Sequence, residues 1–169
     1  MMCEMATSAH NTTLEEDGQT VLRMWKAMGG DEDTLRKGRF GDNDDFGDIS
    51  KWKGIRVEVN RVTRIDWRSM DVCGTMPAEI GALSALTVLN LSHNKRLSGE
   101  LPKELGNLTS LTKLWLRKCG FSGPVPSSFS KLTNLDTLFL RGNQLTTNVP
   151  ASLIENDKEK VQAYLATLT

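Results

Sequence analysis

Leucines recur at a fixed period through the C-terminal part of the chain. Residues 83–102, 108–126 and 132–150 read LSALTVLNLSHNKRLSGELP, LTSLTKLWLRKCGFSGPVP and LTNLDTLFLRGNQLTTNVP. Each phrase ends on a proline, and the prolines at 77, 102, 126 and 150 are spaced by 25, 24 and 24 residues. A period in this range is typical of repeat proteins, in which each copy folds as one structural unit.

Within each copy the pattern L-x-x-L-x-L predicts a short strand, because alternate residues of a strand point to the same face. The glycines at 74, 99 and 123 permit a turn, and each following proline can open a short helical segment. One coil cannot bury its leucines alone, so the copies must stack into a solenoid with a parallel sheet on one side. Glycine and proline inside every copy argue against a repeat of helical hairpins.

A degenerate earlier copy, VNRVTRIDWRSMDVCGTMP, precedes the first full phrase and aligns on Ile65 and Trp67. Asn94 and Asn143 follow the last strand leucine of their copies, where a buried amide can satisfy backbone groups as the chain leaves the strand. Cys119 holds this position in the copy between them.

These features resemble the leucine-rich repeat family, and in particular its plant-type pattern LxxLxxLxLxxNxLxGxxPxxLxxL, over residues 59–155. The resemblance implies an α/β solenoid, a short right-handed leucine-rich repeat superhelix with a parallel concave β-sheet. It also implies an N-terminal helical cap and a C-terminal capping helix. We expect about four coils within residues 61–155, because the degenerate copy stacks before the three full ones.

The N-terminal cap is expected over residues 13–60, after a disordered tail at 1–12. Val21, Leu22, Trp25 and Met28 form the apolar side of an amphipathic helix that ends at a Gly-Gly pair. Thr13 with a glutamate three residues later is typical of a capping box, which would start the helix there. An acidic loop follows, and alternating Ile, Val and Val at 55, 57 and 59 predict a strand or hairpin that joins the sheet.

The C-terminal cap is expected over residues 156–169. Val161, Tyr164, Leu165 and Leu168 have helical spacing, and Asn156 is a plausible helix start. This segment also resembles the one that joins repeats to the GTPase domain of ROCO-type proteins. The sequence VLRMWKAMGG of the first helix resembles the corresponding segment of algal and bacterial family members.

Composition and charge set limits on function and location. The chain has 169 residues, and Lys+Arg and Asp+Glu both total 21, which argues against nucleic-acid or membrane-surface binding. No basic region followed by an apolar stretch opens the sequence. The segment WKGI at 52–55 resembles the cap motif of the family, yet the flanking cysteines of secreted plant members are replaced near Ser50 and Val57. Without that cap disulfide, we expect a cytoplasmic protein.

Residues between and beside the strand leucines should face solvent on the concave side, where equivalent residues of stacked coils form columns. Aromatic and arginine side chains dominate binding hot spots, and the strongest patch combines Trp115 and Phe139 with Arg117 and Arg141. The candidate binding residues are Arg64, Asp66, Arg68, Val88, Asn90, His93, Lys113, Trp115, Arg117, Thr137, Phe139 and Arg141.

The sequence therefore predicts a non-enzymatic, monomeric module that binds a protein or peptide, including acidic or carboxylate-bearing segments. A structural interpretation stays open, in which Arg117 and Arg141 cover the two aromatic rings as cation–π pairs. Two functional alternatives also stay open. They are a regulatory or scaffold segment of a larger signalling protein and a secreted receptor-like recognition protein.

No catalytic residue, metal ligand set or cofactor motif is expected. The acidic stretch DNDDFGD at 42–48 places Phe46 and Lys53 where a calcium-binding EF-hand loop needs oxygen ligands, although a looser oxygen site stays open. The two histidines, His10 and His93, have no adjacent nucleophile in the repeat pattern.

Overall fold

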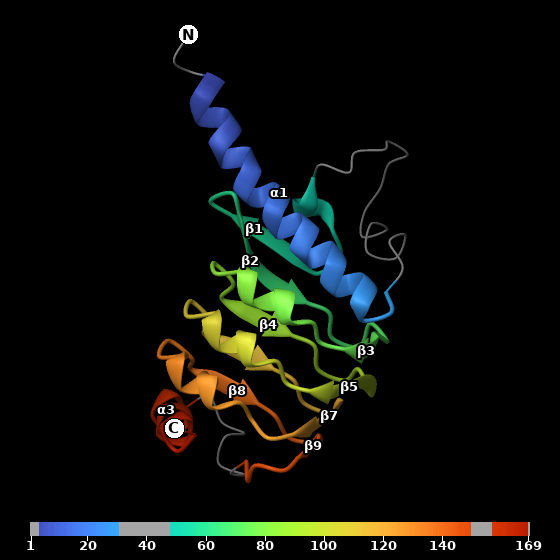
Figure 1. The fold of residues 1–169 in the computed structure, drawn as a ribbon, viewed down its shortest axis with the longest axis vertical. Coiled ribbons are helices and arrows are strands. Elements are labelled where there is room, and N and C mark those ends of the chain that lie inside the picture. Colours follow the sequence, from blue (N-terminus) through green and yellow to red (C-terminus); the bar gives the residue numbers. More distant parts are fainter. Residues whose placement is uncertain (1–3, 31–47, 150–156, 169) are drawn as a thin grey trace.

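The computed structural model describes residues 4–30, 48–149 and 157–168, with backbone alone over 4–12, and the chain is a stack of coils between two helices (Figure 1). One side of the stack is a five-stranded sheet in the order β1-β2-β4-β6-β8. Its strands are β1 Ile55–Glu58, β2 Arg61–Asp66, β4 Val88–Asn90, β6 Lys113–Trp115 and β8 Thr137–Phe139.

The strands of the coils pair in parallel and in register, as the repeat predicts. Ile65 pairs with Leu89, Leu89 with Leu114, and Leu114 with Leu138, and all four side chains are buried. Because the register aligns leucine on leucine, the core is a continuous apolar column along the stack. The first coil stacks regularly as well, since Trp67 fills the leucine position and its indole N–H donates to the carbonyl of Lys53 at 3.0 Å.

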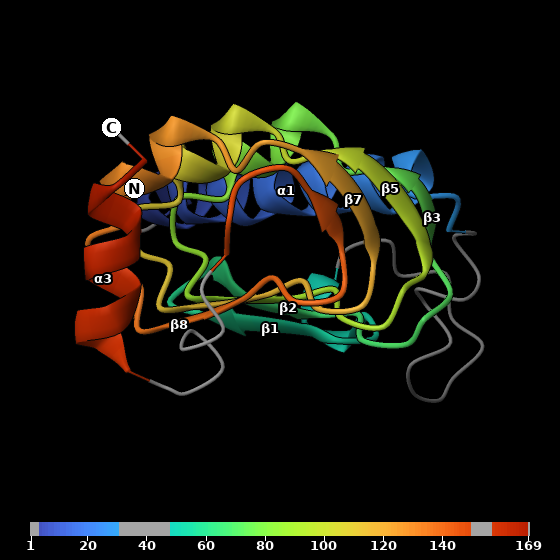
Figure 2. The same cartoon turned by 90° about the horizontal axis from the view of Figure 1, so that it is seen from below.

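The remaining sides of each coil, away from the five-stranded sheet, carry short helices and a second sheet (Figure 2). Short 3-10 helices follow the first three prolines of the repeat and lie across the core from the five-stranded sheet. They are η2 Ala78–Ala82, η3 Lys103–Asn107 and η4 Ser127–Lys131. A second parallel sheet in the order β3-β5-β7-β9 joins these layers, where the sequence predicted turns alone. Its strands are β3 Cys73–Thr75, β5 Arg96–Glu100, β7 Gly120–Gly123 and β9 Gln144–Leu145.

Side-chain amides tie neighbouring coils together. The side-chain amide of Asn94 donates to the carbonyls of Trp67 at 2.9 Å and of its own coil's Leu91 at 2.7 Å. Asn143 repeats the arrangement with two carbonyls at 2.7 Å. Cys119 makes a weaker substitute, with its sulfur 3.2 Å from the carbonyl oxygen of Leu91. The predicted role of the asparagine position is therefore confirmed.

The front of the stack is closed by α1, Glu4–Ala27, which lies against β2 and η2. Trp25 packs edge-on against Trp67 with ring centroids 4.9 Å apart. Asp17, which is 4% exposed, accepts hydrogen bonds from the Arg61 Nε at 2.9 Å and from the backbone N–H of Val62 at 2.9 Å. These contacts hold helix and sheet together by packing and a partly buried ion pair.

Two N-terminal expectations differ from the structure. The helix begins at Glu4 rather than at Thr13, because the intervening residues include neither proline nor glycine and nothing stops the helix there. Val59 does not extend the strand. It lies in the turn between the antiparallel strands β1 and β2, with φ 47°, and is 93% exposed.

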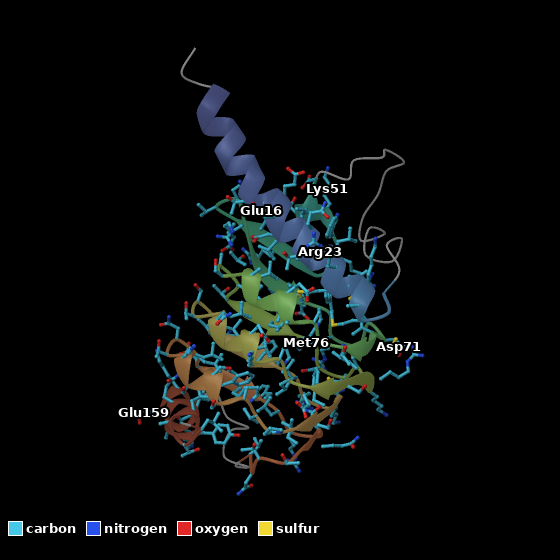
Figure 3. All side chains as sticks on the ribbon, viewed as in Figure 1. Glu16, Arg23, Lys51, Asp71, Met76 and Glu159 are labelled. Carbon is cyan, nitrogen blue, oxygen red and sulfur yellow. The ribbon has the colours of Figure 1, made fainter. Side chains whose placement is uncertain are left out.

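The back of the stack is covered by α3, Lys158–Ala166, which lies against η4 and β8. Its Val161, Tyr164 and Leu165 are buried as predicted, and Asp157 caps the helix by accepting a hydrogen bond from the N–H of Lys160. Charged side chains such as Glu159 on α3 and Arg23 on α1 are exposed (Figure 3). Neither described α-helix combines the length and apolar character needed to cross a bilayer.

Candidate functional site

The exposed face of the five-stranded sheet, here called the concave face, carries the side chains that alternate with the buried leucines. Trp115 pairs in register with Phe139 on the next strand, and both are half-buried. Their rings stack at a centroid distance of 6.1 Å and an interplanar angle of 17°. Leu114, between Lys113 and Trp115, is fully buried, which confirms the strand orientation on which the predicted aromatic patch depends.

Cations surround this aromatic pair. The ammonium group of Lys113 lies 5.9 Å from the centroid of the Trp115 ring, so a lysine rather than either predicted arginine occupies the cation–π position in the described structure. Arg117 and Arg141 are exposed and have no ion-pair partner among the described residues. The indole N–H of Trp115 is enclosed and also lacks a hydrogen-bond partner there.

The N-terminal end of the concave face has its charges paired. Arg64 donates to Asp66 at 2.7 Å, and the other oxygen of Asp66 accepts from the amide of Asn90 at 2.9 Å. Arg68 is exposed and outside this network, and Val88, which pairs in register with Arg64, is half-buried on β4. Arg64 and Asp66 therefore neutralise each other, and Arg68 has no ion-pair partner within the described residues.

Two predicted binding residues are not exposed. Asn90 is 4% exposed, because its amide bonds Asp66 and its carbonyl oxygen accepts the backbone N–H of Ser92 at 3.1 Å. Thr137 is 1% exposed, because α3 lies against β8. Both side chains support the strands, and period-2 alternation could not reveal the covering helix.

His93 stands at the corner where the chain leaves β4. Its backbone is left-handed, with φ 67°, and its Nε2 is enclosed without a partner among the described residues. Desolvation lowers the pKa of His93, and the cations Arg68, Arg117, Lys118 and Lys95 lower it further. Desolvation, as the larger effect, and the surrounding positive charges both disfavour the protonated imidazole.

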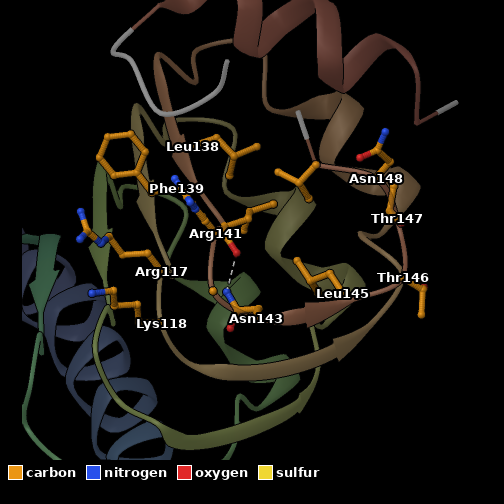
Figure 4. Close-up of a pocket in the computed structure, with 13 residues that line it drawn as sticks. Arg117, Lys118, Leu138, Phe139, Arg141, Asn143, Leu145, Thr146, Thr147 and Asn148 are labelled. Carbon is orange, nitrogen blue, oxygen red and sulfur yellow. Dashed lines mark hydrogen bonds between the residues drawn. The ribbon is translucent and has the colours of Figure 1, made fainter. Parts of the chain in front are cut away.

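A pocket of about 1020 Å³ continues the patch toward the last coil (Figure 4). Arg117, Lys118, Phe139 and Arg141 line one side, and the segment 145–149 lines the other. The repeat pattern carries no signal of this segment, because its exposure depends on the position of the last coil at the end of the stack.

The described residues show no group of three or more metal-ligating side chains. Most of the acidic 42–48 stretch lies outside the described residues, so the expectation that it is no EF-hand loop stays a prediction and the looser oxygen site stays open. Cys73 and Cys119 are free thiols, and burial raises the pKa of Cys119, which disfavours a reactive thiolate.

Comparison with known proteins agrees with the repeat architecture. The family model for the Leucine Rich Repeat matches residues 85–108 and 110–132. The PEPR1–AtPEP1 structure is 32% identical over 84% of this chain and 20% of its own, with a TM-score of 0.70. The repeat ectodomain of the receptor kinase SOBIR1 from Arabidopsis thaliana is 31% identical over 77% of this chain and 68% of its own, with a TM-score of 0.59.

A third structure, the BIR2 ectodomain from Arabidopsis thaliana, is 28% identical over 83% of this chain and 76% of its own, with a TM-score of 0.66. The chain therefore spans about a fifth of the PEPR1 chain and most of the two smaller ectodomains.

The expected cytoplasmic location is wrong. SOBIR1 and BIR2 are matched through ectodomains, which point to an extracellular location. The expectation rested on two missing cap cysteines. The structure shows why their absence carries little weight: Trp25, Trp67 and the Asp17–Arg61 ion pair fasten the cap without a disulfide.

Proposed function

The chain belongs to the leucine-rich repeat family, and from this we propose that it is a recognition module that binds a peptide or protein segment across its concave face. The binding surface is the Trp115–Phe139 stack with Arg117, Arg141 and the adjoining pocket. The partner carries carboxylate or other acidic groups, and the module has no catalytic role.

One observation carries the proposal. Half-buried aromatic rings lie beside two exposed arginines that have no ion-pair partner among the described residues, on the face of the sheet opposite the buried leucines. Unpaired arginine forks bind carboxylates in two-point contacts, and aromatic anchors supply the apolar part of a hot spot.

We also propose that the module works outside the cell, as a receptor ectodomain or a secreted relative of one. PEPR1 with AtPEP1, and the ectodomains of SOBIR1 and BIR2, support this class of recognition protein. The partner itself must be found by experiment, since the chain spans only a fifth of PEPR1.

The test is a selection of displayed random peptides on the folded chain, followed by measurement of Kd for the enriched sequences. We expect enrichment of Asp and Glu, and affinity that falls as salt is added. Changing Trp115→Ala together with Arg117→Ala should weaken binding by about 30-fold or more, from the loss of an aromatic anchor and a charge pair.

The matched control is Lys131→Ala on η4, which removes an exposed cation from the opposite side of the stack. It should leave Kd unchanged. Loss of the Trp115–Phe139 stack should lower stability by only about 0.5–1.5 kcal/mol. The proposal would be contradicted if the enriched peptides showed no excess of Asp and Glu. It would also be contradicted if the double variant and Lys131→Ala bound with equal Kd.

A further inference from the structure

A serine interrupts the row of arginines on the concave face. The residues that follow the second strand leucine of each coil are Arg68, Ser92, Arg117 and Arg141. The backbone ladder holds this row in register, since the N–H of Ser69 donates to Ser92 O at 3.0 Å and the N–H of His93 donates to Arg117 O at 2.9 Å. Neighbouring strands are about 4.8 Å apart, so Ser92 lies between two arginines of the row, Arg68 and Arg117, one on each neighbouring coil.

The hydroxyl of Ser92 is buried and unused. Ser92 is 3% exposed, and its Oγ has no hydrogen-bond partner among the described residues. A buried hydroxyl without a partner destabilises a protein, so such groups normally meet a ligand or water. The nearby amide of Asn90 is already committed, because its oxygen accepts the backbone N–H of Ser92 and its nitrogen bonds Asp66.

Positive groups converge on the same place. Arg68 and Arg117 flank Ser92 in the row, and neither has an ion-pair partner within the described residues. Both also act on the adjacent His93, together with Lys118 and Lys95 from the corners of the coils. The nearest acidic group of the preceding strand, Asp66, is occupied by Arg64 and Asn90.

His93 adds a second polar atom without a partner. Its Nε2 is enclosed and has no partner among the described residues, as with the Ser92 hydroxyl next to it in the chain. Two consecutive side chains therefore present unsatisfied polar atoms between two unpaired arginines. This combination is absent from the corresponding Arg117–Lys118 and Arg141–Gly142 pairs of the later coils.

We propose that Ser92, His93, Arg68 and Arg117 form a site for a tetrahedral oxoanion, a sulfate or phosphate ester carried by the ligand. Donors reach it from both neighbouring strands and from the coil between them, so an acceptor with three or more oxygens in different planes fits better than a planar carboxylate. The inference rests on the proposed docking function of the concave face, and assigns to its central coils a chemistry distinct from the aromatic end.

The test follows His93 by NMR in a His10→Ala chain, which leaves one histidine. Sodium sulfate and sodium phosphate are titrated at constant ionic strength, with sodium chloride and sodium acetate as comparisons. A bound dianion offsets the surrounding positive charge, so the pKa of His93 should rise. Since binding favours the protonated imidazole, sulfate should bind more tightly as pH falls through the pKa of His93.

Ser92→Ala should weaken sulfate binding by about tenfold, because one hydrogen bond to a charged acceptor is lost. Its melting temperature should not fall, since the hydroxyl has no partner to lose in the free protein. Ser127→Ala on η4 is the matched control and should bind as the unaltered chain does. Arg68→Gln should also weaken binding at least tenfold, whereas Lys131→Gln, with the same change in net charge, should not.

The proposal would be overturned if sulfate bound no more tightly than chloride, or if Ser92→Ala left sulfate binding unchanged. In either case the Ser92 hydroxyl would be hydrated and would bind no anion. Acetate binding as tightly as sulfate would overturn the tetrahedral specificity. A stronger response to phosphate than to sulfate would identify a phosphate ester as the group. If acidic peptides bind and their binding requires Trp115, but sulfate does not bind, then this site is refuted and the docking proposal stands.

Discussion

The carboxylate of Asp17 is a polar anchor between the first helix and the sheet. It accepts from Arg61 Nε at 2.9 Å, from Arg61 Nη2 at 3.2 Å and from the backbone N–H of Val62 at 2.9 Å. The hydrogen bond with Asp17 is the main cause of the raised pKa of Arg61. We expect Asp17→Ala to destabilise the chain more than removal of any other charge on the helix.

The magnitude follows from what each partner loses. Val62 N–H would be buried without an acceptor, which costs about 1–3 kcal/mol. Arg61 loses less, because its side chain is 27% exposed and its Nη2 keeps a hydrogen bond to Ser84 at 3.2 Å. The sum is about 2–4 kcal/mol for Asp17→Ala, and about half of that for Asp17→Asn, whose amide oxygen can still accept from Val62.

Urea unfolding followed by tryptophan fluorescence measures these values, since Trp25 and Trp67 meet at this junction. Glu15→Ala is the control, because Glu15 is exposed on the same helix. Arg61→Ala should cost less than Asp17→Ala, because it removes the ion pair but leaves the Val62 hydrogen bond. A loss below about 0.5 kcal/mol for Asp17→Ala, or a loss equal to that of Glu15→Ala, would refute the reasoning.

Three further predictions concern other parts of the chain. Cys119→Asn should raise the unfolding free energy by about 1 kcal/mol, because an amide can make the carbonyl bonds that the sulfur makes poorly, and a lower melting temperature would contradict this. In a secretory host, we expect a glycan on Asn107, which is exposed, and none on Asn90, whose amide nitrogen bonds Asp66. The intact mass of the secreted protein should fall by the mass of one glycan after Thr109→Ala, and an unchanged number of glycans would refute the assignment of a glycan to Asn107. Hydrogen bonds from Lys160 lower the pKa of Asp157, so its contribution to α3 is present above pH 3.8 and is lost as pH falls through the lowered pKa. Helical circular dichroism should show this acid step, and Asp157→Ala should abolish it.

The repeat could be predicted from the sequence because leucine spacing and strand geometry share a period. Leu89, Leu114 and Leu138 had to align if the coils stacked at all, and the orientation of Trp115 followed from theirs. The apolar face of the last helix was equally predictable, because its spacing is helical and Asp157 lies one residue from the expected start.

Features that depend on contacts between elements could not be predicted in this way. Thr137 has the spacing of a surface residue, yet it is buried on β8, the strand against which α3 lies. The second sheet is hidden because its strands include glycines with positive φ, such as Gly99 at 83°, which in a sequence indicate a turn. The free hydroxyl of Ser92 depends on hydrogen bonds that its neighbours make elsewhere, and residue type alone carries no signal of it.

The front cap also constrains how such a chain can evolve. Strand β1 runs against β2, and α1 covers the apolar end on which an earlier coil would have to stack. Duplication of a gene segment can therefore lengthen the molecule only behind β2, where each new coil finds a parallel neighbour. A chain like this one would therefore gain coils in one direction only, and the end covered by α1 would keep its original structure.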